Sequence, residues 1–468
     1  MGWDLSDSQR LRVSALEEST PRRQGAEAQG DVPDGFRDTP LGPLPVEWEV
    51  VRLGELVQQA FSGGTPSTKK PEYWNGDIPW ITSAYIDGLY VTQGARRITE
   101  IGLSNSSSKL VPKDNLLIGS RVGVGKVAIN KIDVAISQDL TGLIIETSQA
   151  DLEFLAFTIS SPQVQNFFVH STRGTTIKGI PREDLLQIPI PLPPLPEQRA
   201  IAHVLRTVQQ AREATERVIA AARELKRALM RHLFTYGPVS IAQADQVALR
   251  ETEVGPVPVE WDVVLLGEIQ TATQYGLSMR GEGEGQYPIL RMNNLLDGRI
   301  DTSGLQYVNL SESDFQKFRL HKGDILFNRT NSYELVGKTA LFDLNDDFVF
   351  ASYLIRVMVN PAYCVPAFFN YYLNFEATQA RLKMLASRGV SQSNISASKL
   401  RGFAVPLPSM EEQREIARIL SAVDARIAAE EARREALDAL FHTLLHHLMT
   451  GKIRTQGRQD AKRQRTET

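Results

Sequence analysis

The chain has 468 residues, more than one hydrophobic core usually accommodates, so two or three folded units are expected. Its charged fraction is 23% and its formal net charge is −3, so composition neither supports nor excludes nucleic-acid binding: a balanced total can hide a basic patch. Cys364 is the only cysteine, which excludes an internal disulfide and a multi-cysteine zinc site and favours the reducing cytoplasm. No run approaches 18 apolar residues, so no membrane-spanning helix is expected.

In chain order, residues 1–40 are polar without a sustained period, which predicts a poorly ordered extension. From 41 to 195, short apolar runs alternate with Gly, Pro, Asp and Asn, which is typical of strands and turns with a few short helices. From 196 to 237 the period becomes that of a long helix with an apolar seam. The expected seam positions, in steps of three and four, are Ile201, Val204, Val208, Ala211, Thr215, Val218, Ala222, Leu225 and Leu229.

The same pattern follows a second time. After a linker at 238–255, residues 256–408 again indicate strands and turns, 409–451 a second long helix, and 452–468 a basic tail. A lone helix of about 57 Å would leave its apolar stripe in water, so the two helices are expected to pair. The prediction is an α+β chain in which two mixed globular domains are separated by an antiparallel two-helix coiled coil with pseudo-twofold symmetry. The alternative is that each helix packs only in the core of its own domain.

The chain is a tandem duplication. The sequence Gly-Pro-Leu-Pro-Val-Glu-Trp at 42–48 recurs as Gly-Pro-Val-Pro-Val-Glu-Trp at 255–261, and Pro-Leu-Pro with Glu-Gln-Arg closes each copy at 191–199 and 406–414. Between them lie further matches at offsets of 210 to 215. These are Leu53-Gly54-Glu55 with Leu266-Gly267-Glu268, Asp87-Gly88 with Asp297-Gly298, Gly125-Lys126 with Gly337-Lys338, and Arg173-Gly174 with Arg388-Gly389.

This ordered set resembles the specificity subunits of type I restriction–modification enzymes over nearly all of 43–453. The resemblance rests on the duplicated motifs together with Gly-Gly-Thr-Pro at 63–66 and Tyr-Trp-Asn-Gly-Asp-Ile-Pro-Trp at 73–80. The resemblance implies two target-recognition domains that each read half of a split, asymmetric DNA site, and paired helices that set the gap. It also implies docking of two methyltransferase subunits and, in the full complex, motor-nuclease subunits. S-adenosylmethionine, ATP and magnesium would belong to these partners, and this chain would hold no catalytic site or cofactor.

The second copy lacks the Gly-Gly-Thr-Pro and Trp-rich segment, as expected if the two halves read different sequences. Base edges require donors and acceptors such as Arg, Asn and Gln, and phosphates require Lys, Arg or hydroxyl groups. The candidate DNA contacts in the first copy are Thr65, Ser67, Lys69, Lys70, Tyr73, Asn75, Arg96, Arg97, Arg121, Lys126, Arg173 and Lys178. Those in the second copy are Asn293, Asn294, Arg329, Asn331, Lys338, Arg388, Gln392 and Asn394.

The repeated pairs, Lys126 with Lys338 and Arg173 with Arg388, are expected on phosphate, because shared chemistry suits the part of DNA that carries no sequence. For each candidate, a solvated surface charge is the alternative. The repeated tryptophans, Trp48 and Trp261, are expected to be buried at the start of each fold rather than to stack on bases.

The sequence also bears on two other classes of function. A self-sufficient enzyme is disfavoured because no Gly-rich cofactor loop and no Asn/Asp-Pro-Pro-aromatic motif occurs. The segment ending in Lys338 and Thr339 only partly matches a phosphate-binding loop, since Ser332 occupies the place of the first glycine. The pair His442 and His446 has helical spacing but no third ligand. A coiled-coil adaptor whose globular ends bind protein stays open, because the net charge is close to neutral.

Overall fold

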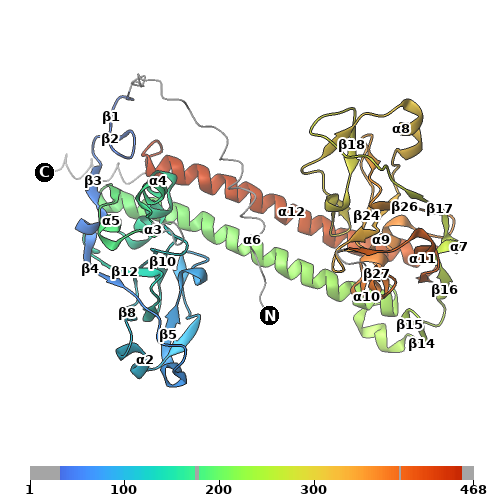
Figure 1. The fold of residues 1–468 in the computed structure, drawn as a ribbon, viewed down its shortest axis with the longest axis horizontal. Coiled ribbons are helices and arrows are strands. Elements are labelled where there is room, and N and C mark those ends of the chain that lie inside the picture. The colour runs from blue at the N-terminus through green and yellow to red at the C-terminus, as the bar shows by residue number, and fades with distance from the viewer. Residues whose placement is uncertain (1–31, 174–178, 389–391, 456–468) are drawn as a thin grey trace. The chain divides into compact units, whose positions relative to one another are not determined.

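The computed structural model describes residues 32–173, 179–388 and 392–455, with only the backbone of Arg388. The described residues divide into two compact units (Figure 1). The first holds the chain up to Gln209 and again from Leu440, and the second holds Gln210–Ala439. Each is a mixed α/β unit that includes one segment of each long helix. The expected fold class, a duplicated α+β chain with two long helices, is confirmed.

The first unit is built on a sheet that is buried on both faces. In its middle strand, β9 (Asn115–Gly119), Leu116 and Ile118 join one apolar cluster and Leu117 joins another, because neighbouring side chains of a strand point to opposite faces. A second sheet covers the face of Leu117. The strand orders are β4 (Val57–Ser62), β12 (Leu140–Ile145), β9, β10 (Val127–Asn130) and β6 (Tyr90–Val91), and then β7 (Arg96–Ile98), β5 (Trp74–Ile81), β11 (Val134–Ile136) and β8 (Lys109–Val111).

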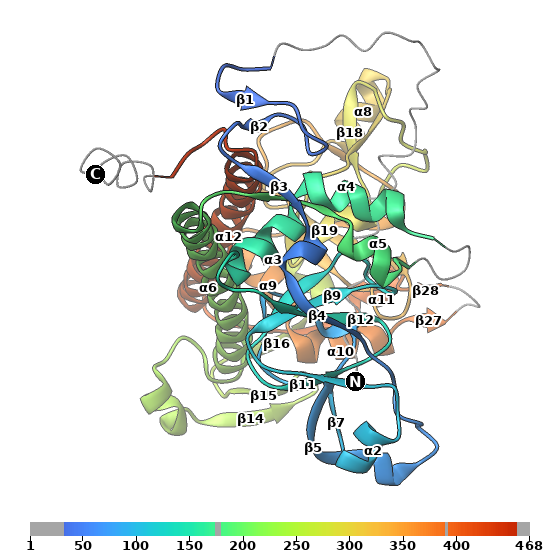
Figure 2. The ribbon, with the colours of Figure 1, turned by 90° about the vertical axis from the view of Figure 1, so that its left-hand side faces the viewer.

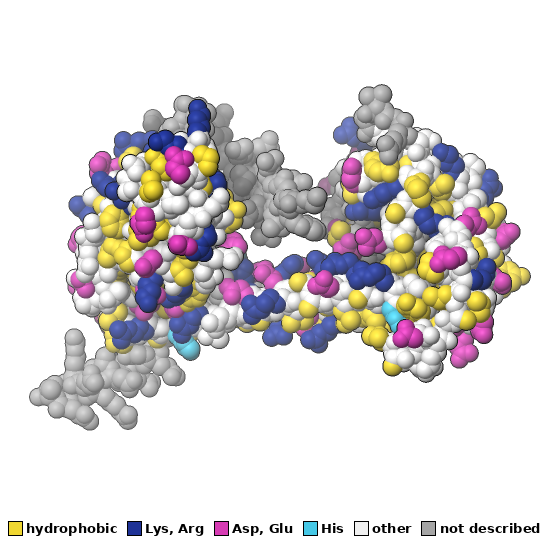
Figure 3. Space-filling view, turned by 90° about the horizontal axis from the view of Figure 1, so that it is seen from below, with side chains coloured by type: hydrophobic (Ala, Val, Ile, Leu, Met, Phe, Trp, Pro, Cys, Tyr) yellow, Lys and Arg dark blue, Asp and Glu magenta, His cyan; other side chains and the backbone are white. Residues whose placement is uncertain are grey.

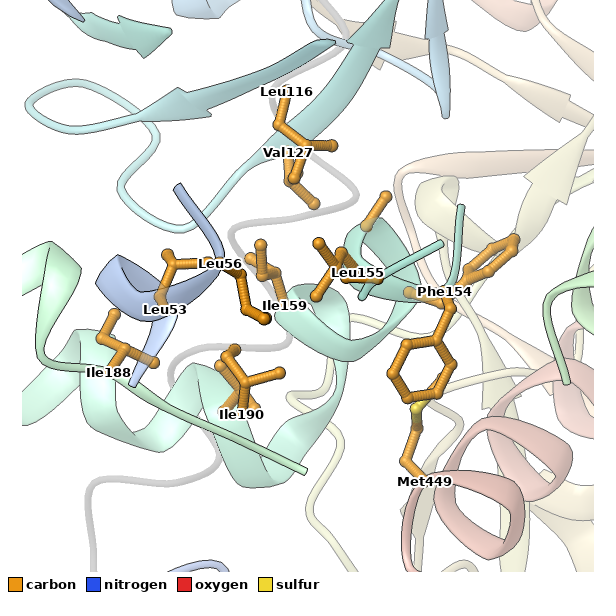
Figure 4. Close-up of a cluster of buried hydrophobic side chains, with 14 of the residues drawn as sticks. Leu53, Leu56, Leu116, Val127, Phe154, Leu155, Ile159, Ile188, Ile190 and Met449 are labelled. Atoms are coloured by element: carbon orange, nitrogen blue, oxygen red, sulfur yellow. The ribbon is translucent and has the colours of Figure 1, made fainter. Parts of the chain in front are cut away.

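Helices cover the other face. α3 (Leu152–Ser160) begins at Asp151, whose side chain caps the Phe154 amide, and it lies between the sheet and the end of α12 (Met410–Met449) (Figure 2). Phe154, Leu155 and Ile159 pack there with apolar side chains from the strands, and Met449 closes the cluster (Figure 4). α4 (Pro162–Ser171) and the first turns of α6 (Leu195–Tyr236) complete this layer.

The second unit repeats this arrangement with fewer strands. Its strand orders are β17 (Gln270–Tyr275), β26 (Leu354–Val359), β22 (Ile325–Asn328) and β24 (Thr339–Leu341), and then β21 (Gln306–Val308), β18 (Tyr287–Leu290) and β25 (Val349–Phe350). α9 (Pro366–Asn374) and α10 (Glu376–Met384) correspond to α3 and α4. As in the first unit, alternate residues of the middle strand β22 belong to different apolar clusters, Ile325 and Phe327 to one and Leu326 to the other.

The Leu-Gly-Glu motif forms a short helical turn in each unit. In the first unit this turn, η2 (Leu53–Leu56), packs on α5 (Arg182–Leu186), and in the second α7 (Leu266–Ile269) packs on α11 (Ala397–Arg401). A Cβ on Gly54 would lie 3.1 Å from the Leu186 carbonyl oxygen, and one on Gly267 would lie 3.2 Å from that of Arg401. The Leu-Gly-Glu motif therefore allows the two short helices of each unit to pack closely. The flanking strand pairs are β3 (Glu49–Arg52) with β13 (Pro189–Leu192), and β16 (Asp262–Leu265) with β29 (Ala404–Leu407).

Two domain boundaries in the structure differ from those expected from the sequence. The first unit begins before residue 41, because β1 (Phe36–Arg37) pairs with β2 (Leu44–Pro45), and Arg37 donates to the Trp48 carbonyl oxygen. The same hairpin opens the second unit as β14 (Leu249–Thr252) and β15 (Gly255–Pro258), so part of the expected linker at 238–255 is folded. In the expected basic tail, the guanidinium of Arg454 pairs with the carboxylates of Glu47 and Glu197.

The remaining described elements are short. In the first unit they are η3 (Pro71–Tyr73), η4 (Ser83–Tyr85) and α2 (Glu100–Ser104). In the second they are η5 (Ile241–Gln246), η6 (Met292–Asn294), β19 (Leu295–Leu296), β20 (Arg299–Ile300), α8 (Glu312–Phe318), β23 (Thr330–Asn331), β27 (Ser387–Arg388) and β28 (Ser393–Asn394). No helix in the described ranges is long and apolar enough to cross a membrane.

The two long helices, α6 with 42 residues and α12 with 40, pack on each other. Within the second unit they run antiparallel, since Arg212 pairs with Asp438, whereas Lys226, further along α6, pairs with the earlier Asp424 of α12.

The expected seam of α6 is wrong at alternate positions. Val218 and Leu225 are 40% and 53% exposed, whereas the next residues, Ile219 and Lys226, face the partner helix. Arg212 replaces Ala211 in the same way. The buried face thus alternates apolar residues with cations that meet carboxylates on α12.

Candidate nucleic-acid interface

The repeated tryptophans are part of the framework and not of the interface, as expected. Trp48 and Trp261 are almost fully buried, and their indole Nε1 atoms donate to Glu197 at 3.3 Å and to Glu412 at 3.1 Å. The glutamine that follows each glutamate is also buried. The amide of Gln198 bonds to backbone groups of residues 149, 151 and 193. The Glu-Gln-Arg motif therefore ties the start of each long helix to its unit.

The Gly-Lys pairs form a turn of the same geometry in both units, between β9 and β10 in the first unit and between β22 and β24 in the second. Gly125 and Gly337 have φ values of 84° and 91°, which L side chains rarely adopt. The Gly119 amide donates to the Lys126 carbonyl oxygen, and the Asn328 amide donates to that of Lys338, each at 2.8 Å. Because β24 directly follows Lys338, the helix that a phosphate-binding loop requires is absent from this described segment.

A second pair of backbone segments lies beside each Gly-Lys turn. In the first unit, Arg173 and Gly179 bridge each other through the backbone, and the Ile180 amide donates to Ser120, the neighbour of Arg121. The Arg173 side chain is exposed and pairs with Asp184 at 2.7 Å. The candidates Arg121, Lys126 and Arg173 are therefore brought together at one edge of the unit, which we call the loop edge. Lys178 lies outside the described residues.

The loop edge of the second unit has the same frame but other side chains. The Ile395 amide donates to the Arg329 carbonyl oxygen, as Ile180 does to Ser120. A small sheet, β23, β28 and β27, joins the candidates at this edge. Asn394 donates to the Thr330 hydroxyl, and the Arg329 guanidinium lies 4.9 Å from the centre of the Tyr275 ring. The candidates brought together are Arg329, Asn331, Lys338, Gln392, Asn394 and the backbone of Arg388.

The Gly-Gly-Thr-Pro segment of the first unit is held by the two tryptophans that follow it. Trp80 donates to the Gly64 carbonyl oxygen at 3.2 Å, and Trp74 donates to that of Ser67 at 3.1 Å. A Cβ on Gly63 would lie 2.3 Å from two backbone oxygens, so this position admits only glycine. The Thr65 hydroxyl bonds to Gln138, which places Thr65 near the loop edge, since the Ser120 amide bonds to the adjacent residue 139.

Other first-unit candidates surround a bulge in β5. The register shifts between Trp74 and Ile78, and Asn75 has a left-handed φ of 62°. Arg97 donates to the carbonyl oxygens of Gly76 and Asp77, and Arg96 stacks over the Trp74 ring at 3.6 Å. Both arginines and Asn75 are exposed. Part of the Arg97 guanidinium is therefore used in hydrogen bonds within the unit, and the Asn75 side chain lies at the surface.

The loop before this bulge carries the last of these candidates. Ser67, Lys69 and Lys70 are exposed. Lys70 donates to the Tyr73 hydroxyl, and this hydrogen bond raises the pKa of the Lys70 ammonium group, so the group stays charged. The Tyr73 ring itself is buried with the two tryptophans, so it belongs to the packing rather than to an open surface.

Asn294 requires a correction. It is 1% exposed, its amide donates to the backbone of Asp301, and its oxygen accepts from the Arg291 amide. The side-chain amide of Asn294 is thus bonded to the backbone on both its nitrogen and its oxygen, so Asn294 is unavailable to a base. Asn293 is exposed beside it, but η6 precedes β19 and lies outside the small sheet of the loop edge. Within the described ranges no group of three or more His, Cys, Asp or Glu side chains could hold a metal ion.

Three structural positions were not expected from the sequence. Gly276 occupies the place of Gly63, since its Cβ would lie 2.4 Å from two backbone oxygens. Gln165 and Gln379 each bond to a Gly-Lys turn. The two glutamines stand at an offset that fits the repeat, which was the available signal. Basic side chains also gather along the long helices, where Arg217, Arg227 and Arg231 of α6 are exposed (Figure 3).

Comparison with known proteins decides the family. The model described as the type I restriction modification DNA specificity domain matches residues 45–222 and again 258–439, which is more than half of the chain. The chain belongs to the type I restriction–modification specificity subunits. This specificity subunit is 25% identical over 422 residues to the MjaVIII specificity subunit of Methanocaldococcus jannaschii, covering 88% of this chain and 94% of that protein. It is also 25% identical over 324 residues to the EcoKI specificity subunit of Escherichia coli K12, covering 68% of each.

Solved structures of such subunits share the fold. The S subunit of a type I system from M. genitalium matches with a TM-score of 0.57 at 18% identity, covering 86% of this specificity subunit and 96% of that chain. A chain from a structural study of complex assembly and conformational transition in the type I system matches with a TM-score of 0.52 at 19% identity, covering 88% and 99%. The duplicated DNA specificity domain thus has a duplicated structural frame.

Proposed function

We propose that this specificity subunit reads a bipartite, asymmetric DNA target, with one half-site at the loop edge of each unit. The proposal rests on one observation: the two loop edges share the same backbone arrangement but carry different side chains. Both loop edges consist of a Gly-Lys turn and a neighbouring backbone pairing that includes an arginine, Arg173 or Arg388. Around this frame the first unit places Arg121, and the second places Asn331, Gln392 and Asn394. A shared frame suits the uniform backbone of DNA, and unlike side chains suit unlike bases.

The shared basic residues are assigned to phosphate. Lys126 is exposed and Lys338 half-exposed at the corresponding position of the turn, and Arg173 is exposed beside the first. A lysine ammonium is a point charge that binds phosphate without a fixed plane, so it provides affinity and orientation without selecting a base. Arg388 is assigned the same role by its place in the repeat.

The residues that differ are assigned to the bases. Asn and Gln can bond twice to the edge of adenine, and Arg to that of guanine. Gln392 is exposed and Asn331 half-exposed in the second unit. In the first unit Arg121 lies at the loop edge, and Thr65, the 67–70 loop, Asn75 and Arg96 present further polar groups.

The long helices are assigned the spacing of the half-sites and the docking of partners. α6 and α12 are continuous through both units, and ion pairs between them, such as Arg223 with Glu431 at 2.6 Å, fix their register within the second unit. We propose that two methyltransferase subunits dock here and that motor-nuclease subunits join through them. Catalysis, S-adenosylmethionine, ATP and magnesium then belong to these partners, and the complex works in the cytoplasm.

Methylation mapping tests the proposal. The subunit is reconstituted with its methyltransferase partners, and the adenines that the complex methylates in genomic DNA are sequenced. The expected result is a two-part, non-palindromic site with a fixed gap. Asn331→Ala with Gln392→Ala should relax the half-site of the second unit and leave the other unchanged, whereas Arg121→Ala should do the reverse. A palindromic site, or variants that alter both half-sites alike, would contradict the proposal.

The competing function, a protein-binding adaptor, makes a different prediction. DNA binding by the reconstituted complex should weaken steeply as salt rises, because each neutralised phosphate releases counterions. If the complex does not bind a pool of duplexes, or if its binding does not respond to salt, the adaptor function is favoured.

A further inference from the structure

We infer that Gln165 and Gln379 are positioning residues that hold the lysine of each Gly-Lys turn toward the DNA backbone; this rests on the proposed function. Each glutamine lies on the helix that follows α3 or α9, namely α4 or α10, four residues after the N-cap. Their backbone amides bond to the N-cap carbonyl oxygens of Ser161 and Phe375 in the same way. Both side chains are half-buried.

The side-chain amide of each glutamine makes the same two hydrogen bonds. Nε2 of Gln165 donates to the Gly125 carbonyl oxygen at 2.9 Å and to that of Ile159 at 2.7 Å. Nε2 of Gln379 donates to Gly337 at 2.8 Å and to Leu373 at 2.6 Å. Ile159 and Leu373 lie near the ends of α3 and α9. Each amide therefore ties the turn to the helix layer and uses both of its N–H groups.

The turn needs this tie because its backbone is unusual. Gly125 and Gly337 adopt a left-handed conformation, which points the peptide that follows in a fixed direction. That peptide carries the lysine, so the hydrogen bond to the glycine carbonyl oxygen orients the Lys126 or Lys338 backbone. A Cβ on Gly125 would lie 2.6 Å from Oε1 of Gln165, so the glutamine also closes against the turn.

The features that the two units share indicate that the two glutamines have the same role. The bulge in β5, Trp74 and Trp80 belong to the first unit and the small sheet belongs to the second, but the glycine, the lysine and the glutamine are present in both units with the same bonds. In the first unit the Lys126 ammonium donates to the Ile86 carbonyl oxygen at 3.2 Å, and two of its N–H groups are left for a phosphate. The glutamines do not touch DNA in this assignment; they act through the lysines.

A double-mutant cycle tests the inference in the complex reconstituted with methyltransferase subunits. Binding to a duplex carrying the mapped target is measured over a range of salt concentrations for Gln165→Ala, Lys126→Ala and the double variant. Lys126→Ala should reduce the slope of log affinity against log salt by about 0.9, the value for one phosphate. Gln165→Ala should reduce it by the same amount, and the double variant should bind no more weakly than Lys126→Ala. Gln379 and Lys338 should behave alike.

Gln163→Ala is the matched control, because Gln163 lies on the same helix and bonds to His446, away from the turn. It should change thermal stability as Gln165→Ala does, without changing the salt slope. If Lys126→Ala lowers the slope but Gln165→Ala does not, or if the two losses add in the double variant, the positioning role is overturned. If Lys126→Ala leaves the slope unchanged, the phosphate assignment itself fails.

Discussion

The indole Nε1 of Trp48 donates a hydrogen bond to the Glu197 carboxylate at 3.3 Å, across 149 residues of the chain. Trp261 and Glu412 repeat this bond across 151 residues. In each unit the bond joins the motif that opens the repeat to the motif that begins the long helix. The two most visible sequence matches are therefore the two halves of one buried contact, which explains why they occur together.

Removing this acceptor should destabilise the unit that contains it. Glu197→Ala leaves the buried Trp48 N–H without its acceptor and removes one of the two carboxylates that pair with Arg454, at a cost of about 1–3 kcal/mol in the free energy of unfolding. Glu197→Gln keeps one acceptor and should cost less. Urea denaturation measures the change. The exposed neighbour is the control, and Arg199→Ala should stay within about 0.5 kcal/mol of the parent. Equal losses for Glu197→Ala and Arg199→Ala would show that the bond is unimportant.

The close-packed glycines provide a second stability test. Gly63→Ala forces a methyl group toward the Ile136 and Ser137 carbonyl oxygens, and Gly276→Ala does the same toward those of Phe350 and Ala351. Each substitution should lower the free energy of unfolding by about 1–3 kcal/mol, because the backbone must move to accommodate it. Gly88→Ala, with no atom within 4 Å of the added Cβ, should be nearly neutral. A neutral Gly63→Ala would mean that this backbone contact is looser than the distances indicate.

A buried ion pair makes the stability of the second unit sensitive to the loss of either partner. Arg356 bonds to Asp324 at 2.6 Å, with both side chains less than 10% exposed at 8% and 7%. Asp324→Ala should destabilise this unit by about 3–5 kcal/mol, because it leaves an uncompensated buried cation.

Hydrogen–deuterium exchange of β22 and β26 measures this effect where it occurs. The double replacement Asp324→Leu with Arg356→Met should recover much of the loss, since it removes both charges. A single variant that exchanges as slowly as the parent would show that the pair contributes nothing.

The assignment of spacing to the long helices can be tested by matched deletion. Removing one heptad from each helix, 213–219 of α6 and 431–437 of α12, shortens each by about 10 Å at 1.5 Å per residue. The gap between the half-sites should shrink by about three base pairs at 3.4 Å per step, and the half-sites should keep their sequences. Methylation mapping of the reconstituted complex gives both quantities. An unchanged gap with altered half-sites would contradict the assignment.

Much of the frame could be predicted from the sequence, because repeated motifs and helical periods are local properties of the chain. The duplication, the buried tryptophans and the two long helices all follow from residue identity and spacing. The face of α6 was harder to predict. Val218 and Ile219 are both apolar neighbours compatible with the helical period, and only the acidic residues of α12, which attract Arg212 and Lys226, select the second register.

In the candidate interface, too, some features could be predicted from the sequence and others could not. The sequence identified the repeated Gly-Lys and Arg-Gly pairs, but not that they meet at one edge, since that depends on contacts between distant loops such as Ile180 with Ser120. It also could not separate Asn293, which is exposed, from Asn294, whose amide is consumed by the backbone. Residue type determines which hydrogen bonds a side chain can make, and the sequence by itself therefore determined the family and the chemistry available. Only the tertiary structure decided which of those groups are left unpaired at the surface, because burial and pairing are properties of the neighbours brought together by folding.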